Sequence, residues 1–159
     1  MTDTNTSGVN TGGIPPGNVL SYNPIVGSSS IDSFGAGKAM AQSASEDGTV
    51  VPANASSSGT LPRAIVTGLA AGTGVVGGRV VVQQGGVLSL TTAEWDAVLS
   101  TEGGLTTGAT YWLAASFPGN AGNLTPTRPT ASGTFAVQVG MASSPTDMVI
   151  QIGFPIENL

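Results

Sequence analysis

Histidine and cysteine are both absent from this sequence of 159 residues. Their absence excludes Ser-His-Asp and Cys-His catalysis, the common zinc sites and any disulfide. A chain without cysteine is typical of a protein made in a reducing cytosol. Charged residues are also scarce: they make up 8% of the chain, whereas an ordinary soluble domain has roughly a quarter.

Positive charge is the scarcest kind. The chain has four basic residues against nine acidic ones, so its net charge is −5. Four cations cannot form the basic surface that nucleic acids or anionic lipids require, and we expect neither partner. The first ten residues have no basic stretch and no apolar stretch, and no apolar run approaches the ~20 residues of a membrane span. The sequence therefore predicts neither a signal peptide nor a membrane segment.

Short apolar runs separated by small residues dominate what is present. Glycine accounts for 24 residues, and Val, Leu and Ile come in short runs. This pattern is typical of many short strands joined by tight turns. We predict an all-β fold, a small antiparallel sandwich or barrel with one short helix, preceded by an extended N-terminal arm. The predicted strands cover residues 38–43, 49–51, 63–69, 78–84, 87–90, 110–114, 135–141 and 148–152.

The one helix is predicted just after Thr91. Thr91 and Glu94 have the spacing of a capping box, in which each side chain accepts a hydrogen bond from the other residue's backbone amide. Trp95, Val98 and Leu99 follow at the spacing of one helical face. We expect the glycines at 103 and 104 to end the helix in a left-handed conformation.

The strand at 110–114 places alternate residues on opposite faces. Tyr111 and Leu113 share one face, and Trp112 lies on the other. We predict that the helix and this strand form the structural core, which consists of Trp95, Val98, Leu99, Tyr111 and Leu113.

Residues 1–35 have a different composition from the remainder. Glycine and proline break every period, and the apolar residues are scattered. Such a segment cannot bury a core of its own. It could fold back on its own subunit, but we expect it to lie on neighbouring subunits. We therefore divide the chain into an arm, 1–35, and a β-domain, 36–159, with a core module at about 61–153. The predicted capsid or subunit contacts are Ile14, Val19, Leu20, Tyr22, Ile25, Val26 and Phe34.

Catalytic patterns are weak, and we predict a protein that is not an enzyme and holds no metal or cofactor. Glu94 and Asp96 are the nearest approach to a catalytic carboxylate pair, but positions two apart on a helix point in different directions. The segment 35–39 (GAGKA) resembles a phosphate-binding loop only in part. It lacks the first glycine of that motif and the serine or threonine after the lysine.

The long loop at 118–132 is the other unusual segment, because loops of this length commonly bind something. Together with the exposed face of the 110–114 strand it offers a possible glycan or partner site. The alternative is that the aromatic residues here serve only the core between helix and sheet. The candidate contact residues are Trp112, Asn120, Asn123 and Arg128.

The stretch from Val80 to Ile152 resembles a module of virion surface proteins in tailed bacteriophages, the capsid decoration (cement) and head- or tail-fibre proteins. The motifs are VQQGGVLSLTTAEWD at 82–96, GLTTGATY at 104–111, LTP at 124–126 and VQVG at 137–140. The resemblance covers a little under half of the chain and leaves out the arm. Trp112 stands where a tyrosine is common in the module, which has no catalytic residues to lose.

This resemblance implies a structural role in the virion. Proteins of the family commonly act as trimers on an icosahedral shell. We therefore expect a homotrimer on the outer capsid surface, made in the host cytoplasm and bound to the major capsid protein. The alternative is a head- or tail-fibre module that binds a host-surface glycan.

Overall fold

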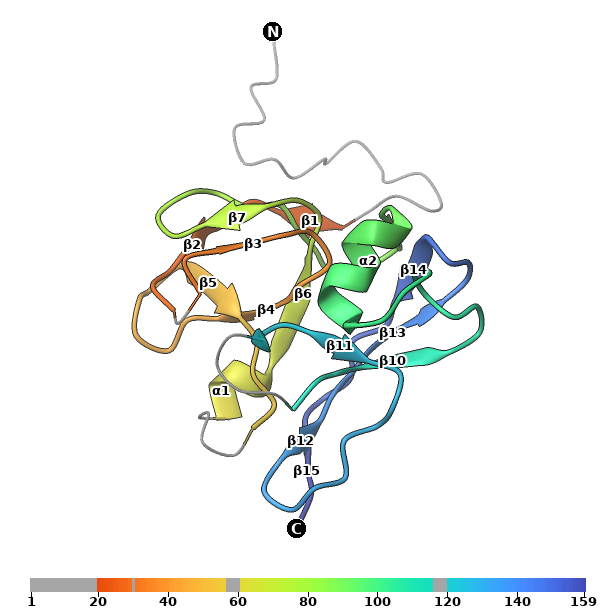
Figure 1. The fold of residues 1–159 in the computed structure, drawn as a ribbon. Coiled ribbons are helices and arrows are strands. Elements are labelled where there is room, and N and C mark those ends of the chain that lie inside the picture. The colour runs from red at the N-terminus through yellow and green to blue at the C-terminus, as the bar shows by residue number, and fades with distance from the viewer. Residues whose placement is uncertain (1–19, 30, 57–60, 116–119) are drawn as a thin grey trace, which may run out of the picture.

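A computed structural model of the chain describes residues 20–29, 31–56, 61–115 and 120–159. The fold is all-β and mainly antiparallel, as the sequence predicts. Figure 1 shows two sheets side by side, with one helix of two turns against them. The helices are α1 (Leu61–Ala64) and α2 (Thr92–Leu99).

The first sheet has six strands in the order β1-β8-β6-β4-β5-β2. Only the β2–β5 pair is parallel. The sheet curls back on itself, because the backbone of Val26 bonds to Gly77 and Gly78 while the next residue, Gly27, bonds to Val50. The strands are β1 (Ser21–Tyr22), β2 (Ile25–Val26), β4 (Ala39–Gln42), β5 (Thr49–Pro52), β6 (Val66–Ala70) and β8 (Val82–Gln83).

The second sheet has five antiparallel strands in the order β11-β10-β13-β14-β9. Two further strand pairs, β3–β7 and β12–β15, lie at opposite ends of the molecule in Figure 1. The strands are β9 (Val87–Ser89), β10 (Thr110–Leu113), β11 (Leu124–Thr125), β13 (Gln138–Ala142), β14 (Asp147–Ile150), β3 (Ser33–Phe34), β7 (Gly74–Val75), β12 (Phe135–Ala136) and β15 (Ile156–Glu157).

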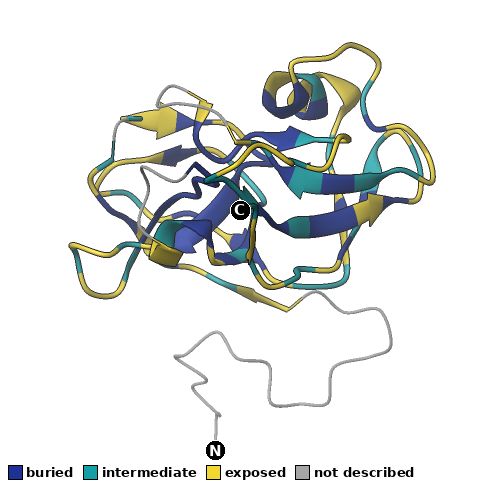
Figure 2. Cartoon of the chain, turned by 90° about the horizontal axis from the view of Figure 1, so that it is seen from below, coloured by how far each residue is buried: buried dark blue, intermediate teal, exposed yellow. Residues whose placement is uncertain are grey.

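Two apolar clusters stabilise this arrangement. The larger lies between the sheets and under α2, and it includes all five residues predicted for the core. The smaller cluster includes Met40 of β4. Ala39 and Ala41, which lie on the opposite face of β4, belong to the larger cluster. Figure 2 shows that the buried residues lie mainly on the central strands and on one side of α2, whereas most loops and some outer strands are exposed. The alternation along β4 thus lets one strand serve both cores.

The start of α2 confirms the predicted capping box. The Glu94 amide donates to the Thr91 hydroxyl oxygen, and the Glu94 carboxylate accepts from the Thr91 amide. The predicted end of the helix is wrong. Ser100, with φ of 56°, takes the left-handed position directly after Leu99. Gly103 and Gly104 lie in the turn that follows, where Asp96 accepts from both of their amides.

Residues 20–29 and 31–34 are part of the β-fold rather than a separate extension, because β1 and β2 belong to the first sheet and β3 pairs with β7. Val26 and Phe34 were expected to contact another subunit, but their side chains are buried in the smaller cluster of this chain. Tyr22 is half-buried, and its hydroxyl hydrogen-bonds to Thr67. Leu20 and Ile25 are exposed. The remaining predicted contacts, Ile14 and Val19, lie outside the described residues.

Candidate functional site

The outer face of the second sheet carries a row of three side chains. In the strand register, Trp112 of β10 pairs with Thr125 of β11 on one side and with Gln138 of β13 on the other. Directly opposed residues in a sheet place their side chains on the same face. All three are partly exposed, whereas their neighbours point inward and are buried: Tyr111, Leu113, Leu124, Val137 and Val139. We call these three residues the outer row.

Arg128 lies over this row. Its guanidinium carbon is 5.7 Å from the centroid of the Trp112 ring, within the range of a cation–π interaction. Arg128 is exposed and Trp112 half-buried, so the pair is open to solvent on one side. Among the described residues, the guanidinium has this ring contact and no hydrogen bond.

The other three basic side chains are engaged elsewhere. Lys38 donates to Ala121 and Asn123. Arg63 donates to the Pro52 carbonyl, and Arg79 to the Asn23 carbonyl. Arg128 is therefore the one basic side chain that makes no hydrogen bond among the described residues.

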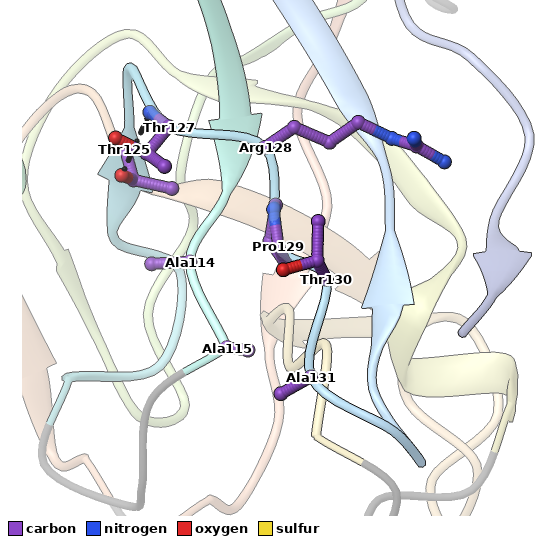
Figure 3. A pocket seen from close by; sticks show the side chains of 8 residues that line it. All are labelled: Ala114, Ala115, Thr125, Thr127, Arg128, Pro129, Thr130 and Ala131. Carbon is purple, nitrogen blue, oxygen red and sulfur yellow. Dashed lines mark hydrogen bonds between the residues drawn. The ribbon is translucent and has the colours of Figure 1, made fainter. Parts of the chain in front are cut away.

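A hollow of about 380 Å³ lies beside the Arg128–Trp112 pair. Its floor and walls are small apolar and threonine side chains: Ala114, Ala115, Thr125, Thr127, Pro129, Thr130 and Ala131. Arg128 also lines the hollow, and Figure 3 shows its side chain directed away from Ala114 and Ala115. The segment that carries Arg128 and Pro129 is fixed by Asn158. The Asn158 side-chain amide donates to the Pro129 carbonyl and the Thr134 hydroxyl, both at 3.1 Å.

The structure brings together two of the four residues predicted for a glycan or partner site. Trp112 and Arg128 are in contact. Asn120 is exposed at the start of the turn that leads to β11. Asn123 cannot contact a ligand with its side chain, because it is 6% exposed and its amide oxygen accepts from buried Lys38. Thr125 and Gln138 have no signal in the sequence, because only the strand register places them beside Trp112.

Lys38 is a buried ammonium with neutral partners. The residue is 9% exposed, and its Nζ donates to the Ala121 carbonyl at 3.1 Å and to the Asn123 side-chain oxygen. These bonds tie the start of β4 to the segment before β11. Burial lowers the pKa of Lys38 from its ordinary value of 10.5, because the charged form loses hydration.

A second hollow, of about 270 Å³, borders Lys38 on the side of α2. Glu94 also lines it, but the carboxylate of Glu94 accepts from the amide and hydroxyl of Thr91. These bonds lower the pKa of Glu94. Asp96 accepts from the amides of the turn after α2. Each of the two carboxylates considered for catalysis is therefore engaged at one end of the helix.

The lowered pKa of Lys38 has a consequence for stability. Between the folded pKa and the unfolded value of 10.5, the unfolded chain binds more protons, so the free energy of unfolding rises with pH. We expect wild-type protein to gain stability relative to Lys38→Met as the pH rises through the alkaline range towards 10.5. Denaturant unfolding at a series of pH values measures this difference.

The comparison with Lys38→Met is needed because Tyr22 acts in the opposite direction. Burial raises the pKa of Tyr22 above 10.0, so its contribution falls as the pH rises past that value. Tyr22 is common to both proteins and cancels in the difference. Parallel stability profiles for the two proteins would contradict the assignment to Lys38.

Within the described residues, no three His, Cys, Asp or Glu side chains are grouped as metal ligands would be. No helix in the described ranges has the length and apolar character needed to cross a membrane. Comparison with known proteins finds no matching family model and no matching curated protein. The resemblance of residues 80–152 to phage virion surface proteins therefore rests on the sequence motifs alone.

Proposed function

We propose that the chain is a non-enzymatic virion structural protein that decorates and stabilises a bacteriophage capsid. Its partner is the major capsid protein, and it acts as a homotrimer on the outer capsid surface. The partner, the trimer and the location follow from the motif resemblance. The structural observation that supports an assembly role is an exposed apolar surface around the C-terminal strand.

This C-terminal apolar surface consists of Leu61, Ile65, Phe154 and Ile156, which are 51%, 45%, 91% and 56% exposed. Ile65 and Phe154 line the same shallow hollow of about 100 Å³, so α1 and the segment before β15 are adjacent. Among the described strands, β15 pairs only with β12. Large exposed apolar side chains that gather in one place mark a surface for protein contacts.

The proposal predicts that purified protein binds expanded shells that lack it and raises their melting temperature. Phe154→Ser combined with Ile156→Thr should weaken shell binding by about 100-fold or more, because the burial of each apolar side chain contributes roughly 1.5–3 kcal/mol. Co-sedimentation with the shells measures the loss.

Val75→Thr is the matched control. Val75 is 55% exposed, close to the 56% of Ile156, but it lies in β7 at the other end of the molecule (Figure 1). Shell binding by this control should equal that of the wild type. If wild-type protein does not bind the shells and leaves their melting unchanged, the proposed function is wrong.

A second candidate function is a head- or tail-fibre module that binds a host-surface glycan. The observation that favours it is the Arg128–Trp112 pair, open to solvent on one side, together with the hollow that Arg128, Thr125 and Pro129 line. An aromatic ring next to uncommitted polar groups is suited to a sugar, which has an apolar C–H face and a polar edge.

A further inference from the structure

We propose that the outer row and Arg128 form a binding site for a saccharide that carries a carboxylate, such as a uronic or sialic acid. This inference rests on the second proposed function and specifies its ligand class.

Arg128 supplies the preference for a carboxylate. A guanidinium offers donors in a planar fork that matches the two oxygens of a carboxylate. Contact with the Trp112 ring at 5.7 Å limits the positions of the Arg128 side chain, so less freedom is lost when a ligand binds. Because no hydrogen bond within the described residues competes for its donors, a ligand carboxylate does not have to displace a protein acceptor.

Trp112 supplies the surface for the sugar ring. A carboxylate held by the Arg128 guanidinium lies close to the indole, since the two groups are in contact. Trp112 is partly exposed, and the part of the ring that Arg128 does not cover is available to the C–H groups of a pyranose. The inward direction of Tyr111 and Leu113 keeps β10 fixed in the core, so the ring stands on a rigid strand.

Gln138 and Thr125 supply polar groups on the two sides of the ring. The Gln138 amide can both donate to and accept from sugar hydroxyls. The Thr125 hydroxyl oxygen accepts from the Thr127 amide at 3.1 Å, which leaves its proton for a ligand. Thr125 also lines the 380 Å³ hollow, so a second sugar unit can extend from the outer row towards Thr127 and Thr130.

The acidic character of the whole chain does not prevent this recognition. The net charge is −5, which disfavours an anionic ligand at long range. At physiological salt, however, charges farther away than about 8 Å are largely screened. Binding should therefore depend on Arg128 itself and not on the overall charge.

The test uses two pairs of probes that differ in carboxylate content. One pair is 3′-sialyllactose and lactose. The other is a hexasaccharide with alternating glucuronate units and the same hexasaccharide with its carboxyls reduced to alcohols. Calorimetry or a glycan array compares wild-type protein with Arg128→Gln, Trp112→Ala and Arg79→Gln. Arg79 is an exposed arginine on the first sheet, so Arg79→Gln removes the same charge away from the site.

We expect wild-type protein to bind at least one carboxylated probe about tenfold or more tightly than its neutral counterpart, since an ionic hydrogen-bonded pair contributes roughly 1.5–3 kcal/mol. Arg128→Gln should abolish that preference. Trp112→Ala should weaken both members of the pair, and Arg79→Gln should bind as the wild type does. Thermal melting of each variant verifies its fold. We expect the fold to be preserved, because Arg79 and Arg128 are exposed and Trp112 is half-buried on the outer face of its sheet.

The possible failures are distinguishable. Equal binding of carboxylated and neutral probes would overturn the inference and leave glycan binding in place. An equal loss of preference in Arg79→Gln and Arg128→Gln would also overturn it, because net charge and not a site would then be responsible. If none of the four probes binds, both the inference and the second proposed function fail.

Discussion

A protein that lacks residues 1–35 should fail to fold, whereas one that lacks only residues 1–19 should unfold cooperatively like the full chain. The longer deletion removes β1, β2 and β3, together with the buried side chains of Val26 and Phe34. Loss of a buried phenylalanine side chain costs about 3–5 kcal/mol and a valine roughly 2 kcal/mol. Exposed strand edges add to this loss, and the total is comparable to the roughly 5–15 kcal/mol that stabilises a domain.

Circular dichroism and urea titration of the two truncated proteins test this expectation. The shorter deletion is the control, because it keeps all the described strands and both apolar clusters. A cooperative transition of wild-type midpoint in the protein that lacks 1–35 would show that the first three strands do not contribute to the fold. The same pair of proteins separates folding from shell binding, since only a folded variant gives a meaningful binding result.

The boundary at residue 35 was missed because the strands before it leave no periodic signal. β1, β2 and β3 have two residues each, too few for an alternation to be recognised. Their partners are distant in sequence: Tyr22 pairs with Val82, and Phe34 with Gly74. Composition alone indicates an arm, and only the tertiary pairing assigns these residues to a sheet.

Local signals predicted the centre of the chain better. The Thr91–Glu94 capping box and the inward direction of Tyr111 and Leu113 depend on neighbours within a few residues, and the sequence contains all of that information. The predicted end of the helix is wrong because Ser100 adopts the left-handed conformation, which glycine usually takes at the end of a helix. Here the amide of Ser100 still donates to the Asp96 carbonyl, which completes the last turn.

The candidate site required information that the sequence does not contain. Alternation places Trp112 on the outer face, but its neighbours depend on the register of three strands, and the register shifts between Tyr111 and Trp112. Asn123 is predicted to contact a glycan or partner because it lies in the long polar loop of the sequence. Its true partner is Lys38, 85 residues away, and a buried pair at that separation has no local signature.

Trp95→Ala should produce the largest loss among single substitutions of the core. Trp95 has no exposed surface, and it belongs to the larger cluster, where α2 packs against the sheets. Its indole N–H donates to the Thr146 carbonyl at 2.9 Å. Removal of a buried tryptophan side chain costs about 3–5 kcal/mol, and the Thr146 carbonyl loses its donor as well. Denaturant unfolding should show a midpoint far below that of the wild type.

Trp95→Phe separates packing from the hydrogen bond. Phenylalanine keeps an aromatic ring in the cluster but has no donor for Thr146, so we expect a smaller loss of roughly 1–3 kcal/mol. Trp112→Phe is the control, because Trp112 is partly exposed on the outer row and should change stability by less than about 1 kcal/mol. Equal losses for Trp95→Ala and Trp112→Phe would contradict the assignment of α2 to the core. The expected order separates the roles of the two tryptophans, since Trp95 packs the helix against the sheets and Trp112 lies on the outer row.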